Sequence, residues 1–329
     1  YVKSFTSFPN LGEFRFVSGL LENSIELPCD IPSKRTWLHA GDDAAQFDGW
    51  LVTKDLSVEG THFRLDWSSP EEAVEKNIVS NVSDISAMGG KPQIALLGLC
   101  LNKNWTENEK NRVSEAFKKG LAKRGIALIG GDTVVGSTGV FSLTLLGTPQ
   151  EHVLRRNGAS VGENIFVVGS LGKSAAGLWV LENCPEEKAR FKRLVDYHLS
   201  PGIIENAGAD LVRFGVRGAC IDISDGLSSE LTHLAKSSQV GMQIFENKLP
   251  IDPEVLEMSV FFGLNPLNFA LNGGEEYQLL FTSSLDEVIF NKNGSFSVTC
   301  IGSVIEGNAV LIQNEKGNRI LEAGAFTHL

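Results

Sequence analysis

The chain has 329 residues, of which 42% are hydrophobic and 21% charged, and its formal net charge is −11. This length exceeds what one ordinary core contains and predicts a globular protein of about two domains. The acidic balance argues against a nucleic-acid binder, which needs a basic surface. No apolar run approaches the roughly 20 residues of a membrane span. Five scattered cysteines without a C-x-x-C pair indicate reduced thiols. With no signal-peptide pattern at the start, we expect a cytoplasmic protein without nucleic-acid or membrane partners.

The segment 41–63, GDDAAQFDGWLVTKDLSVEGTHF, contains an unusual density of acids. Asp42 and Asp43 are adjacent, and we expect a short strand that ends near Asp55. No Lys or Arg neighbours the first two aspartates in the sequence, and unpaired carboxylates are costly unless they are solvated or hold a cation. Because Asp is also common in turns, a solvated turn is the alternative interpretation.

A helix is predicted to follow this segment. Ser69 is a favourable N-cap, Pro70 suits the first helical position, and Glu72 completes a capping box. Gly89 is predicted to end this helix. On a second face of this helix, Asn77, Asn81 and Asp84 are spaced i, i+4 and i+7. An ordinary solvated face would more often carry Lys and Glu, so this one is predicted to turn toward a polar site.

The next elements are predicted in chain order from apolar runs and turn residues. A buried strand is expected at 94–100, and Thr106 with Glu109 forms a second capping box. A strand at 126–129 is expected to end before Gly130-Gly131-Asp132, where the glycines allow close backbone approach. After a strand at 140–147, a turn and a charged stretch predict a domain boundary. The predicted domains are therefore residues 1–149 and 150–329.

In the second half, Gly172-Lys173-Ser174 follows a predicted strand at 165–169 and suggests a P-loop. That motif requires another glycine at position 167, which is valine, so the P-loop interpretation fails. A glycine turn that opens a helix at 174–182 explains the sequence better.

A strand at 219–223 carries Asp222 and ends in Ser224-Asp225-Gly226, with a helix starting near Leu227. Helix capping would explain Asp225 but not an acid inside an apolar strand. A similar group of glycines and acids, Gly273-Gly274-Glu275-Glu276, precedes a strand at 278–282. Two further strands are expected at 298–304 and 309–313.

Acids in these positions form the candidate site: Asp42, Asp43, Asp55, Asp84, Asp132, Asp222 and Asp225. Seven carboxylates without matching cations can converge only around divalent ions. Oxygen ligands favour Mg²⁺, or Mn²⁺ and Ca²⁺, over zinc. Magnesium with glycine-rich turns indicates nucleotide phosphate chemistry. A carboxylate pair for glycoside hydrolysis is the alternative, but it would leave most of the acids unexplained.

Seven segments occur in family order from residue 41 to residue 282: GDDAA, TKDLSVEGTHF, NVSDISAMGGKP, IGGDT, RRNGASVGENIFVVGSLGKSAAGL, IDISDGL and LNGGEEYQLLFT. On these segments the chain resembles the thiamine-monophosphate kinase family, in the superfamily typified by aminoimidazole ribonucleotide synthetase. The resemblance implies a mixed α+β fold of two α/β domains, the first of which pairs its sheet with a second subunit in a homodimer. It also implies direct transfer of the γ-phosphate of ATP to thiamine monophosphate, giving thiamine diphosphate, with several Mg²⁺ ions.

The resemblance assigns roles to particular residues. Metal contacts are implied for Asp43, Thr53, Asp55, Asp84, Asp132, Asp222 and Asp225, of which Asp43, Asp84, Asp132, Asp222 and Asp225 are also expected to be catalytic. Contacts to ATP are implied for Gly131, Asp132, Arg156 and Ser224. Contacts to thiamine monophosphate are implied for His62, Glu275 and Phe326.

Lys54 is the main departure from the family pattern, which usually has threonine or a small residue there. If the strand is regular, Lys54 points away from Thr53 and Asp55. If it bends, the ammonium enters the acid cluster. Lys54 also keeps open a non-catalytic nucleotide- or thiamine-binding homologue. A further alternative is another ATP-using member of the superfamily, such as an aminoimidazole ribonucleotide synthetase-like enzyme or a hydrogenase-maturation ATPase.

Overall fold

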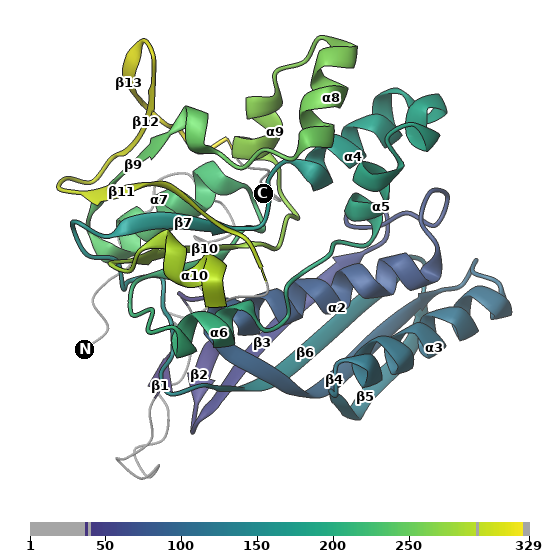
Figure 1. Cartoon of the computed structure of the whole chain (residues 1–329). Coiled ribbons are helices and arrows are strands. Elements are labelled where there is room, and N and C mark those ends of the chain that lie inside the picture. The colour runs from purple at the N-terminus through teal and green to yellow at the C-terminus, as the bar shows by residue number, and fades with distance from the viewer. Residues whose placement is uncertain (1–36, 39–40, 294–295, 325–329) are drawn as a thin grey trace.

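The computed structural model describes residues 37–38, 41–293 and 296–324, and it contains two β-sheets with helices packed on them (Figure 1). The first sheet has six strands in the order β1-β2-β3-β6-β4-β5. Its strands are β1 (Trp37–Leu38), β2 (Ala45–Phe47), β3 (Trp50–Val58), β4 (Gly90–Asn102), β5 (Ala127–Gly136) and β6 (Val140–Pro149). The mixed α+β class expected from the sequence is confirmed. Among the helices in the described part of the chain, none is long and apolar enough to cross a membrane.

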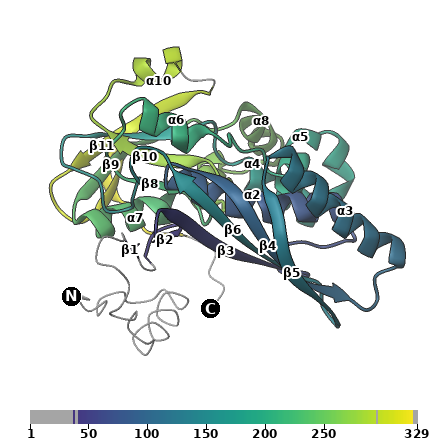
Figure 2. The same cartoon turned by 90° about the horizontal axis from the view of Figure 1, so that it is seen from below.

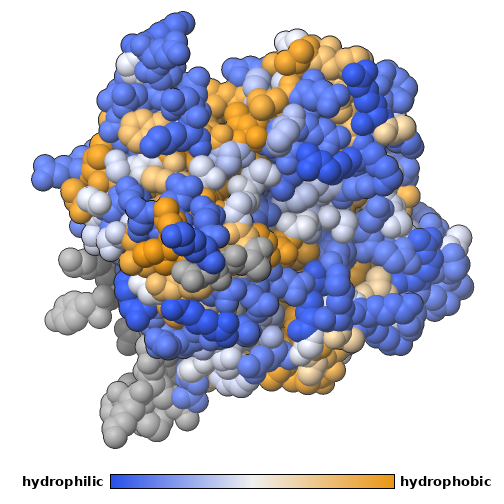
Figure 3. Space-filling model, in the orientation of Figure 1, coloured by the Kyte–Doolittle hydropathy of each residue, from blue (hydrophilic) through white to orange (hydrophobic). Residues whose placement is uncertain are grey.

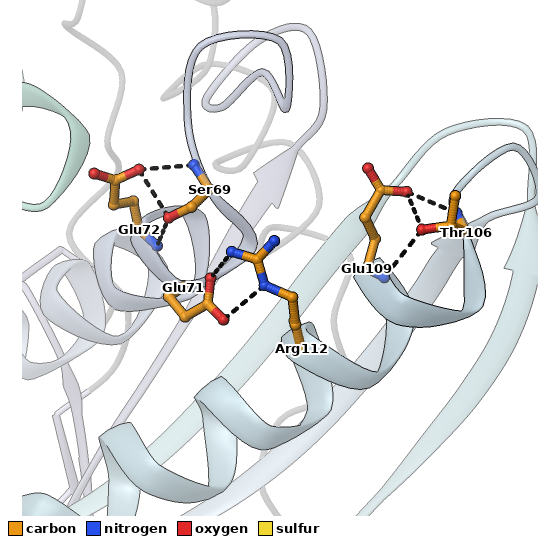
Figure 4. Close-up of polar contacts among 6 residues, drawn as sticks. All are labelled: Ser69, Glu71, Glu72, Thr106, Glu109 and Arg112. Carbon is orange, nitrogen blue, oxygen red and sulfur yellow. Dashed lines mark hydrogen bonds and ion pairs between the residues drawn. The ribbon is translucent and has the colours of Figure 1, made fainter.

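Both predicted capping boxes are formed (Figure 4). At the start of α2 (Pro70–Ala87), the Ser69 hydroxyl accepts a hydrogen bond from the Glu72 backbone N–H, and the Glu72 carboxylate accepts one from the Ser69 N–H at 2.7 Å. Thr106 and Glu109 make the same reciprocal pair at the start of α3 (Glu107–Lys123). Each box satisfies two backbone donors that a helix start leaves free.

Helices α2 and α3 lie side by side on one face of the first sheet (Figure 1). An ion pair of 2.6 Å joins Glu71, in the first turn of α2, to Arg112 of α3 (Figure 4). Beneath them, Ile78 and Phe117 pack against Phe141 of β6 in one buried cluster. This packing fixes α2 over β3 and β6, and so fixes the polar side chains of α2 relative to those of β3.

The other face of the first sheet is not covered by α2 or α3, and Figure 2 views the strands from that side. In β3, Thr53 and Ser57 are buried under α2, whereas Lys54 and Leu56 are exposed. Residues of a strand alternate between faces. Lys54 therefore points away from Thr53 and Asp55, as the regular-strand alternative predicts.

Several strands are longer than the sequence suggested, β3 and β5 among them. β3 continues through Asp55 because it pairs with β6 without interruption from Leu51 to Val58. β5 continues through Gly131 and Asp132 because it pairs in parallel with β4 as far as Gly136, with one register shift. The glycines that were expected to end this strand therefore lie inside it. Gly131 packs tightly there, because a Cβ at this position would lie 1.9 Å from the Leu97 carbonyl oxygen.

The second sheet has seven strands in the order β13-β12-β9-β11-β7-β10-β8. They are β7 (Asn164–Val168), β8 (Cys220–Asp222), β9 (Gly241–Phe245), β10 (Leu279–Ser283), β11 (Val298–Ile305), β12 (Val310–Asn314) and β13 (Gly317–Ile320). The pairs between neighbouring strands are antiparallel except that of β9 with β12. Strand β9 and the helices between 253 and 272 were not expected from the sequence.

Helices cover both faces of the second sheet. Those of this half are α4 (Lys173–Asn183), α5 (Lys192–Leu199), α6 (Ala207–Arg213), α7 (Leu227–Ser238), α8 (Pro253–Phe262), α9 (Pro266–Asn272) and α10 (Glu287–Asn293), with short 3₁₀ turns η1 (Pro185–Ala189) and η2 (Glu246–Lys248). Leu231 of α7 belongs to a buried cluster on one face, and Phe290 of α10 belongs to a separate cluster with Phe166 and Phe281 on the other.

Helix α2 also contacts the second half of the chain. Gly208 of α6 packs so tightly on it that an added Cβ would lie 1.7 Å from the Ser86 carbonyl oxygen. The Gly208 N–H donates to the Ser86 hydroxyl at 3.2 Å. Ser83 of α2 also hydrogen-bonds Asp222 of β8, so this helix touches both sheets, and Asp84 on its polar face lies where the halves meet. The domain boundary after residue 149 stays a prediction.

Candidate active site

Three carboxylates from distant parts of the chain meet at this junction. Asp43 precedes β2, Asp84 lies on α2 and Asp222 ends β8, yet one oxygen from each lies within 4.8 Å of the others. Thr53 of β3 donates a hydrogen bond to Asp84, and Ser83 donates one of 2.5 Å to Asp222. The structure thus brings together four of the predicted metal contacts, Asp43, Thr53, Asp84 and Asp222.

Burial and neighbouring charges raise the pKa values of two of these carboxylates, Asp84 and Asp222. Burial raises the pKa of Asp84 well above its ordinary value, and the charges of Asp55, Asp222 and Asp43 raise it further. Burial and the charge of Asp43 raise the pKa of Asp222 to about 8. Asp55 contributes the largest of the charge effects on Asp84, so it lies at the same site. Such a cluster resists ionisation until a cation joins it.

The donor set fits a divalent metal ion. Asp43 Oδ2 is buried without a hydrogen-bond partner, and an orphaned carboxylate oxygen is a ready ligand. Carboxylate and hydroxyl oxygens suit Mg²⁺, Mn²⁺ or Ca²⁺, and neither cysteine nor histidine belongs to the three-carboxylate group. Asp43, Asp84 and Asp222 are the residues that would hold such an ion.

Arg156 corrects the sequence argument that Asp42 and Asp43 have no basic partner. Its guanidinium lies 2.5 Å from Asp43 Oδ1, although the two residues are 113 positions apart. The Arg156 backbone N–H donates to Asp42 Oδ1 at 2.7 Å. Burial nevertheless raises the pKa of Asp42 to about 6. One guanidinium therefore offsets part of the cluster's negative charge, and its Nε remains buried without a partner.

Ser224 and Asp225 form the turn after β8, next to a buried acid that sequence reasoning missed. Glu230 of α7 accepts a hydrogen bond from the Asp225 N–H at 3.0 Å. Burial, and then the charge of Asp225, raise the pKa of Glu230 well above its ordinary value. The sequence could have identified Glu230, because it follows Leu227 by three residues and so lies on the same, buried face of the helix.

Glu275 lies in a second polar group, beside the acid cluster. Its carboxylate accepts a hydrogen bond of 2.6 Å from Lys76 of α2, and His198 Nδ1 of α5 lies 3.5 Å from the same oxygen. The charge of His62 also acts on Glu275. Sequence reasoning found His62 and Glu275 but missed Lys76 and His198. Phe326 lies outside the described residues.

Asp132 and Gly131 are not joined to the cluster within one chain. Across the sheet, Asp132 of β5 pairs with Gly98, Gly98 with Ser142, and Ser142 with Leu56 of β3. Paired residues point to the same face. Asp132 is therefore on the open face with Leu56, whereas Asp55 is on the face that α2 covers. Three strand spacings of roughly 4.8 Å also separate it from β3.

The amides of α2 fasten the helix to β3. Asn77 Nδ2 donates to the Ser57 hydroxyl at 2.9 Å, and Asn81 Oδ1 accepts from the Asp55 N–H at 3.2 Å. Both asparagines are fully buried. The predicted polar face exists, and its amides bind β3 at the Ser57 hydroxyl and at the Asp55 backbone.

The rejected P-loop turn has an internal anion in place of a phosphate. The Glu276 carboxylate accepts a hydrogen bond from the Ser174 N–H at 2.9 Å at the start of α4. A helix start is a favourable place for an anion. Lys173 lies over the Tyr197 ring, 3.9 Å from its centroid. The turn Gly172-Lys173-Ser174 thus binds the carboxylate of Glu276 in the same chain.

If ATP is the substrate, as the resemblance implies, Lys173→Ala should change the KM for ATP by less than about threefold, the effect expected for a residue outside the phosphate site. The measurement is steady-state kinetics with varied ATP. A loss of ATP binding of about 100-fold or more in this variant would restore the P-loop interpretation.

On the expectation of an Mg²⁺-dependent kinase, Lys54→Thr should change turnover and the Mg²⁺ requirement by no more than about threefold, because the side chain points away from the three-carboxylate group of its own chain. In the structure the Lys54 ammonium donates to the Ser142 hydroxyl on the open face of the sheet at 2.5 Å. Magnesium titrations of both proteins test this. A steeper Mg²⁺ requirement in the variant would show that the lysine replaces a metal ion.

Comparison with known proteins agrees with this geometry. The family model described as AIR synthase related protein, N-terminal domain, matches residues 41–148. Thiamine-monophosphate kinase of Buchnera aphidicola subsp. Acyrthosiphon pisum is 36% identical over 289 residues, which cover 84% of this chain and 86% of the relative. The kinase of Pyrococcus horikoshii is 34% identical over 296 residues, covering 88% and 90%.

Solved structures extend the likeness to the fold. AaThiL complexed with AMPPCP and TMP has a TM-score of 0.81 and 31% identity, and the match covers 99% of this chain and 100% of that one. Thiamine-monophosphate kinase of Stenotrophomonas maltophilia K279a has a TM-score of 0.73 and 28% identity, covering 92% and 95%. Hydrogenase maturation protein HypE, at 19% identity and a TM-score of 0.67, shares the fold. The chain therefore belongs to the thiamine-monophosphate kinase family.

Proposed function

We propose that the protein is an ATP- and Mg²⁺-dependent kinase that converts thiamine monophosphate to thiamine diphosphate. The observation that carries the proposal is the meeting of Asp43, Asp84 and Asp222 within 4.8 Å in a chain of this family. The relative AaThiL was solved in complex with AMPPCP, which is an ATP analogue, and with TMP. Carboxylate oxygens gathered in this way match the chemistry of phosphoryl transfer, which depends on positioning and charge neutralisation.

In this proposal the residues of the chain have distinct tasks. Asp43, Asp84 and Asp222 hold Mg²⁺, assisted by Asp55, Thr53 and Asp225. A bound Mg²⁺ supplies the positive charge that neutralises the phosphate oxygens during transfer. Arg156 is a guanidinium with an unpartnered buried Nε, suited to phosphate oxygens. Ser224 and Gly131 are proposed contacts to ATP, and His62, Glu275 and Phe326 contact the thiamine moiety.

Transfer is proposed to be direct. A terminal phosphate oxygen of thiamine monophosphate attacks the γ-phosphorus of ATP, the bond to the β–γ bridging oxygen breaks, and ADP leaves with that electron pair. A covalent intermediate would need an activated nucleophile. Cys220, the cysteine next to Asp222, is fully buried, and burial raises its pKa well above the ordinary value. It is therefore unsuited to attack.

The function is tested by measuring ADP release with thiamine monophosphate, thiamine and an aminoimidazole ribonucleotide precursor as acceptors, with and without Mg²⁺. Thiamine diphosphate should form only with thiamine monophosphate, ATP and Mg²⁺. Absence of that product at saturating substrates would contradict the proposal. Product from the aminoimidazole precursor would assign the chain to another branch of the superfamily. A phosphorylated protein in single-turnover reactions would contradict direct transfer.

A homodimer would place Asp132 at an active site. The open face of the first sheet exposes apolar side chains, among them Leu56 at 52% and Val134 at 53%. Figure 3 also shows an apolar area at the lower margin of the molecule, where this sheet reaches the surface. A face of this kind suits a second copy of the chain. We propose that the sheets pair, and that Asp132 and Gly131 serve the site of the partner subunit.

Mixing two inactive variants tests this arrangement. Asp222→Asn and Asp132→Asn homodimers should each be inactive, whereas refolding them together should restore up to about a quarter of wild-type activity, because half of the dimers are mixed and each has one intact site. No recovery in mixtures whose heterodimers are demonstrated by tagged co-purification would place Asp132 in the site of its own chain.

A further inference from the structure

Glu275 is held in an unusual backbone conformation. Its φ is +59° and that of Tyr277 is +53°, and neither residue is a glycine. The left-handed region costs an ordinary residue about 1 kcal/mol, so the surrounding contacts must impose it. The Glu275 N–H donates to the Ser224 carbonyl at 2.7 Å, and the Tyr277 N–H donates to the Ile223 carbonyl at 2.8 Å. The loop is thereby fixed to the turn that follows Asp222.

A buried lysine reaches the same residue from the other half of the chain. The side chain of Lys76 is 6% exposed, and its ammonium lies 2.6 Å from Glu275 Oε2. His198 Nδ1 lies 3.5 Å from that oxygen and 3.1 Å from the Ser174 hydroxyl. Both contacts fall on Oε2, and the Glu275 side chain keeps 26% of its surface exposed. Oε1 is therefore the oxygen left for a ligand.

The charges around Glu275 keep it ionised. Burial raises the pKa of Glu275, but the charge of Lys76 on α2 and the hydrogen bond that its ammonium donates lower it, and the net shift is downward. Burial and the charge of Lys76 lower the pKa of His198 to about 3, so His198 is neutral at physiological pH. Glu276, the adjacent acid, is bound at the start of α4. The ammonium of Lys76 is consequently the main counterion of Glu275.

We propose that Lys76 and His198 are positioning residues that hold Glu275 ionised and oriented, so that its second oxygen binds the cationic or amine-bearing ring of the acceptor. The inference rests on the proposed function and deepens it. Thiamine carries a thiazolium cation and an aminopyrimidine, and either group is attracted to a carboxylate in a poorly hydrated site. A neutral Glu275 would lose that attraction. Lys76 therefore acts on the acceptor and not on ATP.

Lys76→Met tests the inference, because methionine fits the space and favours helix but has no charge. We expect the KM for thiamine monophosphate to rise about tenfold or more at pH 7, while the KM for ATP and kcat at saturating acceptor change by less than about threefold. Without Lys76, burial raises the pKa of Glu275, so raising the pH ionises it again. The KM of the variant should then fall as the pH rises, whereas that of the wild type stays level.

Arg124 provides a matched control. Its side chain is 4% exposed and lies 2.6 Å from Glu75, which is 25% exposed and also belongs to α2. Arg124→Met should lower thermal stability without changing the KM for either substrate. Glu275→Gln should raise the KM for the acceptor at every pH. Lys76→Arg keeps the charge and should bind the acceptor better than Lys76→Met.

The outcomes separate this inference from the proposed function. A wild-type protein that does not phosphorylate thiamine monophosphate refutes the function itself. An active wild type with an unchanged acceptor KM in Lys76→Met refutes the inference. If both KM values and kcat change together at every pH, Lys76 has only a structural role. If Lys76→Met does not fold, Lys76→Gln decides, because a neutral side chain at this position should raise the acceptor KM in the same way, and an unchanged acceptor KM refutes the inference.

Discussion

Asp222→Asn should lower kcat by about 100-fold or more, the range found when a metal ligand or a transition-state charge partner is removed. The same substitution should raise the thermal stability of the metal-free protein. Asp222 lies within a three-carboxylate group, and burial together with the charge of Asp43 raises its pKa to about 8. An amide keeps the size and the hydrogen bond from Ser83 but removes one of the mutually repelling charges.

The stability effect has a defined pH dependence. In the metal-free protein the folded pKa of Asp222 lies above its ordinary value of 3.8. A group with a raised folded pKa contributes stability at low pH that is lost as the pH rises through the folded value. The wild type should therefore lose stability between about pH 4 and pH 8, and Asp222→Asn should lose less. Thermal melts in chelator across that range measure the difference.

Magnesium should reverse the order. An ion that binds only the folded state raises its stability, so the melting temperature of the wild type should increase with Mg²⁺ and that of Asp222→Asn should increase less. Asp196→Asn is a suitable control, because this acid is half-exposed and pairs with Lys192 on the surface. Near-normal turnover in Asp222→Asn, or an unchanged response to Mg²⁺, would show that the cluster has been placed wrongly.

The sequence predicted those features that depend on neighbouring residues. Ser69 with Glu72, and Thr106 with Glu109, located two helix starts because a capping box joins residues three positions apart. The missing glycine at position 167 excluded a P-loop, and in the structure the Glu276 carboxylate binds that turn. Acids beside predicted strands and on one helix face identified Asp43, Asp84 and Asp222, which the structure brings together.

Features that depend on distant pairing could not be predicted in the same way. The partner of Asp43 is Arg156, and that of Glu275 is Lys76, at separations of 113 and 199 residues. Local patterns contain no information about such contacts. The extent of β5 was misjudged for a related reason. Its glycines favour a strand end locally, but parallel pairing with β4 carries the strand through Gly131 and Asp132. The pairing of β5 with β4 thus determines where the strand ends, which the local propensity of its residues did not.

Arg156→Met should also lower kcat by about 100-fold, but it should destabilise the metal-free protein, opposite to Asp222→Asn. The Arg156 side chain is 16% exposed and that of Asp43 is fully buried, and breaking a buried pair by removing one partner costs roughly 3–5 kcal/mol. The cluster would keep its carboxylates and lose the guanidinium that offsets them. Mg²⁺ should therefore restore more stability to this variant than to the wild type.

The double variant Arg156→Met/Asp222→Asn decides whether charge is the cause. If the two residues interact through the cluster, removing one acid should relieve part of the damage caused by losing the arginine, and the metal-free stability changes should deviate from additivity by about 1 kcal/mol or more. Denaturant unfolding of the four proteins in chelator measures this coupling. Additive changes would mean that Arg156 acts by packing against its neighbours, and that its positive charge does not balance the carboxylates at this site.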